Sequence, residues 1–144
     1  MIKQTKKSLG TGVAGNVVTT ITADDDHVIS ALYGQVVLTT DATVANRRVI
    51  FRIDDELGNT LFDSHAGAVV AASATSQHHE FMPGIYRETS FIGNALQIPI
   101  PKDCIISPGY SINLVIENGV AGDSYDYAVL SSVEKVAKGS VLVS

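Results

Sequence analysis

The sequence predicts an all-β protein, an antiparallel β-sandwich with extended N- and C-terminal arms. Two observations lead to this prediction. Apolar and polar residues alternate with a period of two in several segments, as in strands that bury one face and expose the other. Clusters of glycine, proline, asparagine and aspartate separate these segments at intervals of roughly 8–15 residues, which is typical of sandwiches and barrels. A chain of 144 residues is expected to form one domain.

The alternating segments predict eight strands, which in chain order cover residues 14–23, 27–39, 47–54, 59–64, 76–82, 95–100, 110–117 and 124–133. Turn motifs lie between them, namely TDATVAN, ELGN, MPG, IGN, SPG, ENG and AGDS. The alanine-rich segment 65–76 has no clean helical stripe, and we interpret it as a loop or an irregular strand. The prolines of IPIP, residues 98–101, mark a sheet edge or a strand start, because proline cannot donate to a β-ladder.

Segment 48–54 shows the alternation most clearly. Its core face would carry the apolar side chains of Val49, Phe51 and Ile53. Its outer face would carry the polar side chains of Arg48, Arg52 and Asp54. In segment 27–39 the same period puts Val28 and Val36 on one face, and Gly34 indicates a bulge or a bend.

The chain is expected to have three parts, a basic N-terminal arm (1–12), a β-sandwich domain (13–133) and a C-terminal strand or arm (134–144). The first part holds the lysines Lys3, Lys6 and Lys7 and no acid. It would be either a solvated terminus or an arm that docks on an acidic partner. The last part ends in the apolar run Val141, Leu142 and Val143. This run would either complete the sheet or pair with a neighbouring molecule.

The composition narrows the class of function. The net charge of −5 argues against general nucleic-acid binding, which requires a basic stripe. Charged residues make up 17% of the chain, which is low and suggests that a partner covers part of the surface. No apolar run is long enough to span a membrane or to serve as a signal peptide. Cys104 is the only cysteine, so we expect no internal disulfide, folding in a reducing compartment and a buried, inert thiol.

The histidines and acids do not form a recognisable catalytic or metal-binding pattern. His78 and His79 would point to opposite faces of a strand, so they cannot chelate one metal together. The acids of residues 24–26 are either turn residues that bond their own backbone or ligands of a calcium ion, although EF-hand spacing is absent. Ser64 and His65 are adjacent, and no nucleophile elbow accompanies them. We therefore expect no catalytic, cofactor-binding or metal-binding residues and no enzyme activity.

Two groups of residues are candidates for binding. Tyr125 and Tyr127 share a strand face, where they would form either cross-strand packing or a platform for sugars. The arginines Arg47, Arg48 and Arg52 would lie at the entrance and on the polar face of their strand. They would be either a solvated surface with cross-strand ion pairs or a contact with another protomer, since arginine is favoured at interfaces.

Several motifs resemble a type of small β-protein from the virions of tailed bacteriophages. They are ANRRV-x-x-x-I-x-D-x-x-GN-x-L, then F-x-P-G, then IP-x-P, and finally P-G-Y followed by AGD-x-Y. The resemblance covers about residues 36–130 and leaves both arms outside. It implies a jelly-roll-like, non-enzymatic domain that decorates or cements the phage head.

The resemblance also implies partners and a location. The partner would be the major capsid protein or another virion protein, and the chain would reside in the host cytoplasm before assembly. Proteins that assemble on a symmetric shell are usually symmetric themselves, so a homo-oligomer is expected, with a trimer favoured. Nucleic acid and membranes are not expected partners. The alternative is a carbohydrate-binding or receptor-binding sandwich on the virion or its tail.

Overall fold

The computed structural model describes residues 3–13 and 17–136, and these residues form β-strands and no helix. The strands are β1 (Lys3–Val13), β2 (Val17–Thr22), β3 (His27–Thr39), β4 (Arg48–Asp54), β5 (Thr60–His65), β6 (Gln77–Pro83), β7 (Ala95–Ile100), β8 (Ile105–Ile106), β9 (Ser111–Glu117) and β10 (Ser124–Lys135). The predicted all-β class is therefore confirmed. Across these two ranges there is also no helix of the length and apolarity that crossing a bilayer requires.

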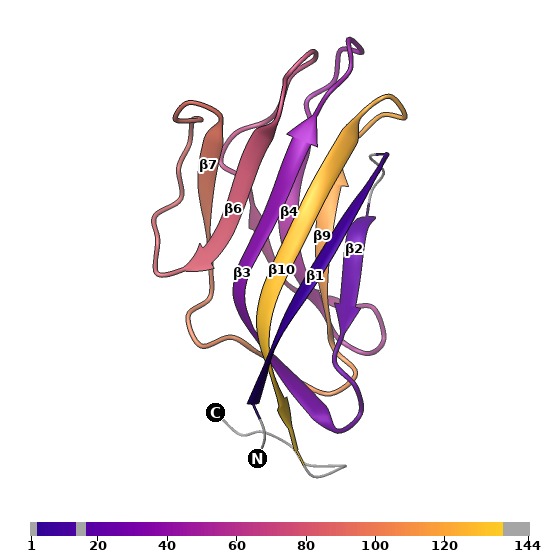
Figure 1. Cartoon of the computed structure of the whole chain (residues 1–144), viewed down its shortest axis with the longest axis vertical. Helices are drawn as coiled ribbons and strands as arrows, with labels where there is room; N and C mark the ends of the chain where they lie inside the picture. The colour runs from indigo at the N-terminus through magenta and orange to yellow at the C-terminus, as the bar shows by residue number, and fades with distance from the viewer. Residues whose placement is uncertain (1–2, 14–16, 137–144) are drawn as a thin grey trace.

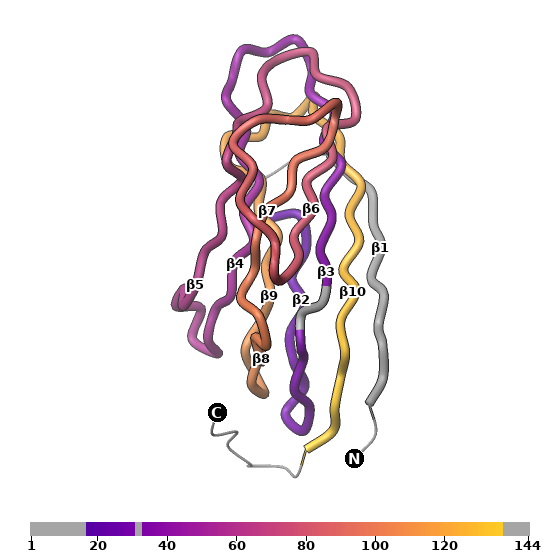
Figure 2. The backbone as a smooth tube through the Cα atoms, turned by 90° about the vertical axis from the view of Figure 1, so that its left-hand side faces the viewer, coloured from indigo at the N-terminus to yellow at the C-terminus, as the bar shows by residue number. Residues whose placement is uncertain are grey.

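The strands form two sheets that pack face to face. The larger sheet has the order β1-β10-β3-β6-β7, with β8 beside β3, and the smaller sheet has the order β2-β9-β4-β5. Figure 1 shows the larger sheet in front of the smaller one, and Figure 2 shows the two sheets as separate layers. The core lies between them. Phe51 of β4 and Phe81 of β6 meet there with ring centroids 5.7 Å apart, which joins the two layers.

The alternation predicted for β4 is confirmed. Its core-facing side chains are buried, namely Val49, Phe51 and Ile53. Ile50 is also buried, although it pairs with Val115 on the outer face of the sheet. That face is therefore not wholly polar.

Strand β3 differs from its prediction at one point. Leu130 of β10 pairs with Tyr33, whereas the next residue, Ser131, pairs with Ala31, so one residue of β3 has no partner in β10. A bulge of this kind reverses the side-chain parity. As a result Ile29, and not Val28, shares the core with Val36. Gly34 lies beyond the irregular step and pairs regularly on both sides.

The N-terminal region also differs from its expected form. The basic arm was placed at residues 1–12, but from Lys3 to Val13 the chain runs as strand β1 along the whole of β10. The expected boundary between arm and sandwich therefore falls inside a paired strand. At the other end β10 continues to Lys135, beyond the expected boundary at 133, and residues 137–144 lie outside the described part of the chain.

One strand pair is parallel. Strands β6 and β7 run in the same direction, so the connection through residues 84–94 has to return along the side of the sandwich (Figure 1). The remaining pairs are antiparallel. Three other connections gather at the upper end of Figure 1, namely residues 40–47 between β3 and β4, 66–76 between β5 and β6, and 118–123 between β9 and β10.

Candidate functional site

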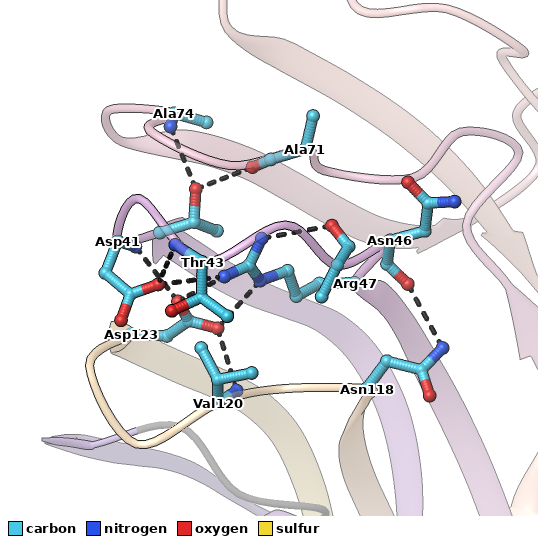
Figure 3. A network of polar contacts seen from close by, with 11 residues as sticks. Asp41, Thr43, Asn46, Arg47, Ala71, Ala74, Asn118, Val120 and Asp123 are labelled. Carbon is cyan, nitrogen blue, oxygen red and sulfur yellow. Dashed lines mark hydrogen bonds and ion pairs between the residues drawn. The ribbon is translucent and has the colours of Figure 1, made fainter.

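The most elaborate polar site lies among these three connections and is centred on Arg47. Its guanidinium binds the Asp123 carboxylate with two hydrogen bonds, from Nε and from Nη2, each 2.9 Å long. Nη2 also donates to Asp41 Oδ1 at 3.2 Å, and Nη1 donates to the Ala45 carbonyl at 3.0 Å. We call Arg47, Asp41 and Asp123 the loop-end cluster (Figure 3).

The sequence places these three residues at strand ends. Asp41 follows β3, Arg47 precedes β4 and Asp123 precedes β10, and the three strand ends meet at the same end of the sandwich. The backbone of Arg47 also forms a two-way bridge with Val70, with hydrogen bonds of 3.0 and 2.7 Å. The 66–76 connection is therefore held against the same point.

Asp123 accepts hydrogen bonds from backbone as well as from Arg47. The amides of Asp41 and Val120 donate to its two oxygens at 3.0 and 3.1 Å. Burial raises the pKa of this carboxyl group. The hydrogen bonds from Arg47 and from the two amides lower it by more, so the pKa lies below its ordinary value. Asp123 is thus a carboxylate at neutral pH.

Arg47 was predicted as a surface residue or a partner contact, and this prediction is wrong. The side chains of Arg47 and Asp123 are both fully buried. A buried charge requires a paired and hydrogen-bonded partner, and Asp123 supplies one from a position that is 76 residues away in the sequence. The alternation of a strand shows which face a side chain occupies, but it does not show which distant residue lies beside it, so the sequence pattern could not identify Asp123 as the partner.

Further bonds tie the same connections together. The Thr40 hydroxyl donates to the Ala71 carbonyl at 2.6 Å and accepts from the Ala74 amide at 2.8 Å. Asn118 Nδ2 donates to the Asn46 carbonyl at 3.2 Å. The groups of the loop-end cluster thus bond one another and the surrounding backbone. This arrangement can fasten three loops. Arg47 and Asp123 are fully buried, and Asp41 is the member of the cluster whose side chain is about one third exposed.

A second polar region covers the outer face of the smaller sheet. Thr20 of β2 donates to Asn113 of β9 at 2.5 Å, Asn113 donates to Asp54 of β4 at 2.6 Å, and Thr60 of β5 donates to Asp54 at 2.9 Å. The row therefore crosses all four strands of the sheet. Asp54, the last residue of β4, accepts the bonds that link this strand to β9 and β5.

The two remaining arginines lie on this outer face, as predicted. Arg52 Nε donates to Asp63 Oδ1 at 2.7 Å, and both side chains are about one third exposed, with a relative accessibility of 30%. That hydrogen bond raises the pKa of Arg52 above its ordinary value. Arg48 is half-buried and has no carboxylate within ion-pair distance in the described ranges 3–13 and 17–136. In the register of the sheet, Arg48 lies opposite Glu117 of β9.

The histidines have separate surroundings. His78 lies on the outer face of the larger sheet, where its Nδ1 is 3.2 Å from Gln35 Nε2. His79 points the other way and is buried, which agrees with the predicted opposite orientation. Among the described residues, no three histidine, cysteine, aspartate or glutamate side chains are grouped so that they could hold a metal ion.

His79 has an unusual environment. Its Nδ1 is 3.1 Å from the Gln77 carbonyl and 3.3 Å from the Val36 carbonyl, so we assign the proton to Nδ1. Nε2 is buried without a hydrogen-bond partner, and the ring meets Phe91 edge-on at 5.3 Å. Burial lowers the pKa of His79 to about 4, so the ring is neutral at pH 7.

Both acidic turns form local bonds. In the first, the His27 amide donates to the Asp24 carbonyl at 3.0 Å, and Asp26 Oδ1 lies 2.7 Å from His27 Nδ1. In the second, Asp55 Oδ1 accepts from the amides of Asn59 and Leu57 at 2.8 and 2.9 Å. These amide bonds lower the pKa of Asp55. The second turn therefore follows the backbone-bonding interpretation of its acid, whereas in the first turn the bonded acid side chain, that of Asp26, lies against the ring of His27.

The remaining candidates fall in different places. The backbones of Lys3, Lys6 and Lys7 lie in β1, whereas Val141, Leu142 and Val143 lie outside the described residues. Tyr125 and Tyr127 pack against the core, with ring centroids 6.4 Å apart. Cys104 is half-buried, and burial raises the pKa of its thiol.

No family model matches the chain, and no curated protein matches it at a significant level.

Proposed function

We propose that this chain is a non-enzymatic structural protein of a bacteriophage virion, of the head decoration or cement type, that binds the shell as a homo-oligomer. The single observation that supports this proposal best is that the charged groups of the loop-end cluster bond one another. The buried ion pair of Arg47 and Asp123 bonds the loops to one another, so the described polar clusters support stability and surface contact better than catalysis.

The outer face of the smaller sheet is the surface that we propose for shell contact. Asp63 forms an ion pair with Arg52, whereas Arg48, four residues before Arg52 on the same face, has no carboxylate within ion-pair distance in the described part of the chain. Arginine is enriched at interfaces because it combines charge with a planar, multiply donating group. The partner would be an acidic patch on the major capsid protein or on another virion protein.

The termini supply further contacts in this proposal. The sequence of β1 contains Lys3, Lys6 and Lys7, which suit an acidic shell surface, and the apolar run 141–143 suits strand addition to a neighbour. The protein would wait in the host cytoplasm before assembly. The trimer expected from the sequence rests on shell symmetry alone.

Co-sedimentation with shells of the encoding phage, assembled without this chain, tests the proposal. Wild-type protein should bind saturably and should raise the temperature at which the shells break. Arg48→Glu should weaken binding by roughly tenfold or more, because a like charge then faces the acidic patch. Lys102→Glu makes the same charge change at an exposed turn and should bind as wild type does. Wild-type protein that fails to bind shells would refute the proposal.

The carbohydrate-binding alternative loses its main support. The two tyrosines that were expected to form a sugar platform, Tyr125 and Tyr127, pack against the core and are only partly accessible. A glycan array probed with the intact protein is expected to stay silent, and a reproducible hit would revive this alternative.

A further inference from the structure

The four strands at the sheet edges differ in how they are protected. The larger sheet ends at β1 and β7, with the two-residue β8 beside β3 off this path, and the smaller sheet ends at β2 and β5. An edge strand presents unpaired backbone N–H and C=O groups, which recruit another strand unless charges, prolines, bulges or a covering segment prevent it. The four edges can therefore be compared by the protection that each one has.

The edge of β7 is closed by its own connection. The Gln97 amide donates to Glu88 Oε1 at 2.6 Å, and the Gln97 carbonyl accepts from the Glu88 amide at 3.0 Å. Ala95 exchanges two backbone hydrogen bonds with Ile92, of 2.9 and 3.2 Å. The next edge-facing residue is Pro99, which has no N–H to offer. No regular strand can add to this edge.

The edge of β5 is also obstructed. Asp63 brings a charge to the strand, and the guanidinium of Arg87 donates to the His65 carbonyl. The Ser64 hydroxyl donates to the Pro99 carbonyl at 2.6 Å, and this hydrogen bond joins β5 to β7 on this side of the sandwich. On the opposite side, the sequence of β1 contains three lysines, a residue type that natural proteins use to blunt edges.

Strand β2 is the exception. Its sequence, VVTTIT, has six β-branched residues and no charge, proline or glycine. Among the described residues, none of those from Val17 to Thr22 makes a backbone hydrogen bond beyond the pairing with β9. An irregular step between Val17 and Thr19 affects only the first end of the strand, and pairing is regular from Thr19 to Thr22.

We propose that β2 is the oligomerisation edge of this protein and pairs antiparallel with β2 of a second copy across a two-fold axis. A two-fold pairing sets the same short strand against itself, which charged edges such as β1 and β5 would resist by repulsion. The uncharged β-branched strand meets no such repulsion, and threonine and valine pair favourably across antiparallel strands. The smaller sheets of two copies would then become one continuous sheet.

This inference deepens the homo-oligomer of the proposed function and replaces the favoured trimer by a dimer as the first contact. Light scattering on the purified full chain should give twice the chain mass of 15.2 kDa. In the proposed pairing Thr20, which is exposed near the middle of the strand, lies close to the axis. Thr20→Lys and Thr20→Glu should each raise the dimer Kd by roughly a hundredfold, since each places like charges together.

An equal mixture of the Thr20→Lys and Thr20→Glu proteins should recover the dimer, because opposite charges then face each other. This recovery also shows that both variants fold, although each loses the bond from Thr20 to Asn113. Thr75→Lys, at an exposed position of the 66–76 connection, is the matched control and should remain dimeric.

Three results would overturn the inference, namely a monomeric wild type, an oligomer that both Thr20 variants preserve, or a mixture that stays monomeric. Shell binding is measured separately, so an oligomer built through another surface would remove the β2 contact and leave the proposed function standing. Failure of shell binding by a β2-paired dimer would do the reverse.

Discussion

At the scale of single residues, Arg47 determines how the upper end of the sandwich is held. Its guanidinium is fully buried and is bound bidentately by Asp123. Such a pair need not stabilise more than an apolar pair of the same shape, but removing one partner leaves an uncompensated buried charge. The position therefore tolerates very few substitutions, although nothing in its local sequence indicates this.

Asp123→Asn should lower the free energy of unfolding by about 3–5 kcal/mol, because it leaves the buried guanidinium without its main counter-charge. Urea denaturation followed by circular dichroism measures this loss. Arg52→Ala removes an ion pair that is partly exposed and should cost at most about 1 kcal/mol. Equal losses for the two variants would show that burial of the Arg47–Asp123 pair has no special cost.

Sequence reasoning predicted some residues well and others badly, for one physical reason. Alternation reports which face of a strand a side chain occupies, so the core positions Val49 and Phe51 and the opposite orientation of the two adjacent histidines were predictable. It does not report which distant residue lies beside a strand end. In the sequence Asp123 is only part of the turn motif AGDS, and its role as the counter-charge of Arg47 depends on the fold, which brings the two side chains together.

At the scale of elements, the β4–β5 hairpin depends on its turn. Asp55 accepts the amides of Leu57 and Asn59, and the Gly58 amide donates to the Asp55 carbonyl at 3.1 Å. Gly58 has a φ of 83°, in the left-handed region that glycine occupies without steric cost. The ELGN motif was therefore a reliable turn signal, because each of these bonds is local.

Gly58→Ala should cost about 1–2 kcal/mol of stability, since a Cβ is strained at this φ even though the space around it is open. Gly34→Ala is the matched control. A Cβ there would meet Phe81 Cβ at 3.7 Å, an ordinary contact, so its cost should be well below that of Gly58→Ala. Thermal unfolding compares the two variants, and the reverse ranking would contradict the backbone argument.

The elements that the sequence missed are those without alternation. Strand β1 is rich in lysine and glycine, and only its long pairing with β10 makes it a strand. Strand β8 has two residues and exists because it pairs with β3. The bulge in β3 was expected near Gly34, but it is determined by the register with β10, which no local pattern contains.

At the scale of the whole molecule, His79 links stability to pH. In the unfolded chain this imidazole has its ordinary pKa of 6.5, whereas in the folded protein its pKa is about 4. Between these two values the unfolded state binds the proton more readily, so stability falls as the pH decreases from 6.5 towards 4. The total loss from this group is about 3 kcal/mol.

Urea denaturation midpoints measured between pH 7.5 and pH 4.5 test this expectation. The wild type should lose stability through this window, and His79→Leu, which cannot be protonated, should be nearly independent of pH there. His78→Leu, on the outer face, provides the control and should keep the wild-type slope. A slope that persists in His79→Leu would assign the acid sensitivity to another group.

The position of β10 has a consequence for how the protein is made. The ribosome completes this strand after the other nine described strands, yet it lies between β1 and β3 in the larger sheet. While the chain is being synthesised, β1 has no neighbour and β3 has one open side, so the sheet cannot be completed during most of translation. Folding that depends on such distant pairing takes milliseconds to seconds. The nascent chain therefore exposes open strand edges for longer than a protein built from local hairpins. Chaperones would bind the unpaired edges of β1 and β3 during this time.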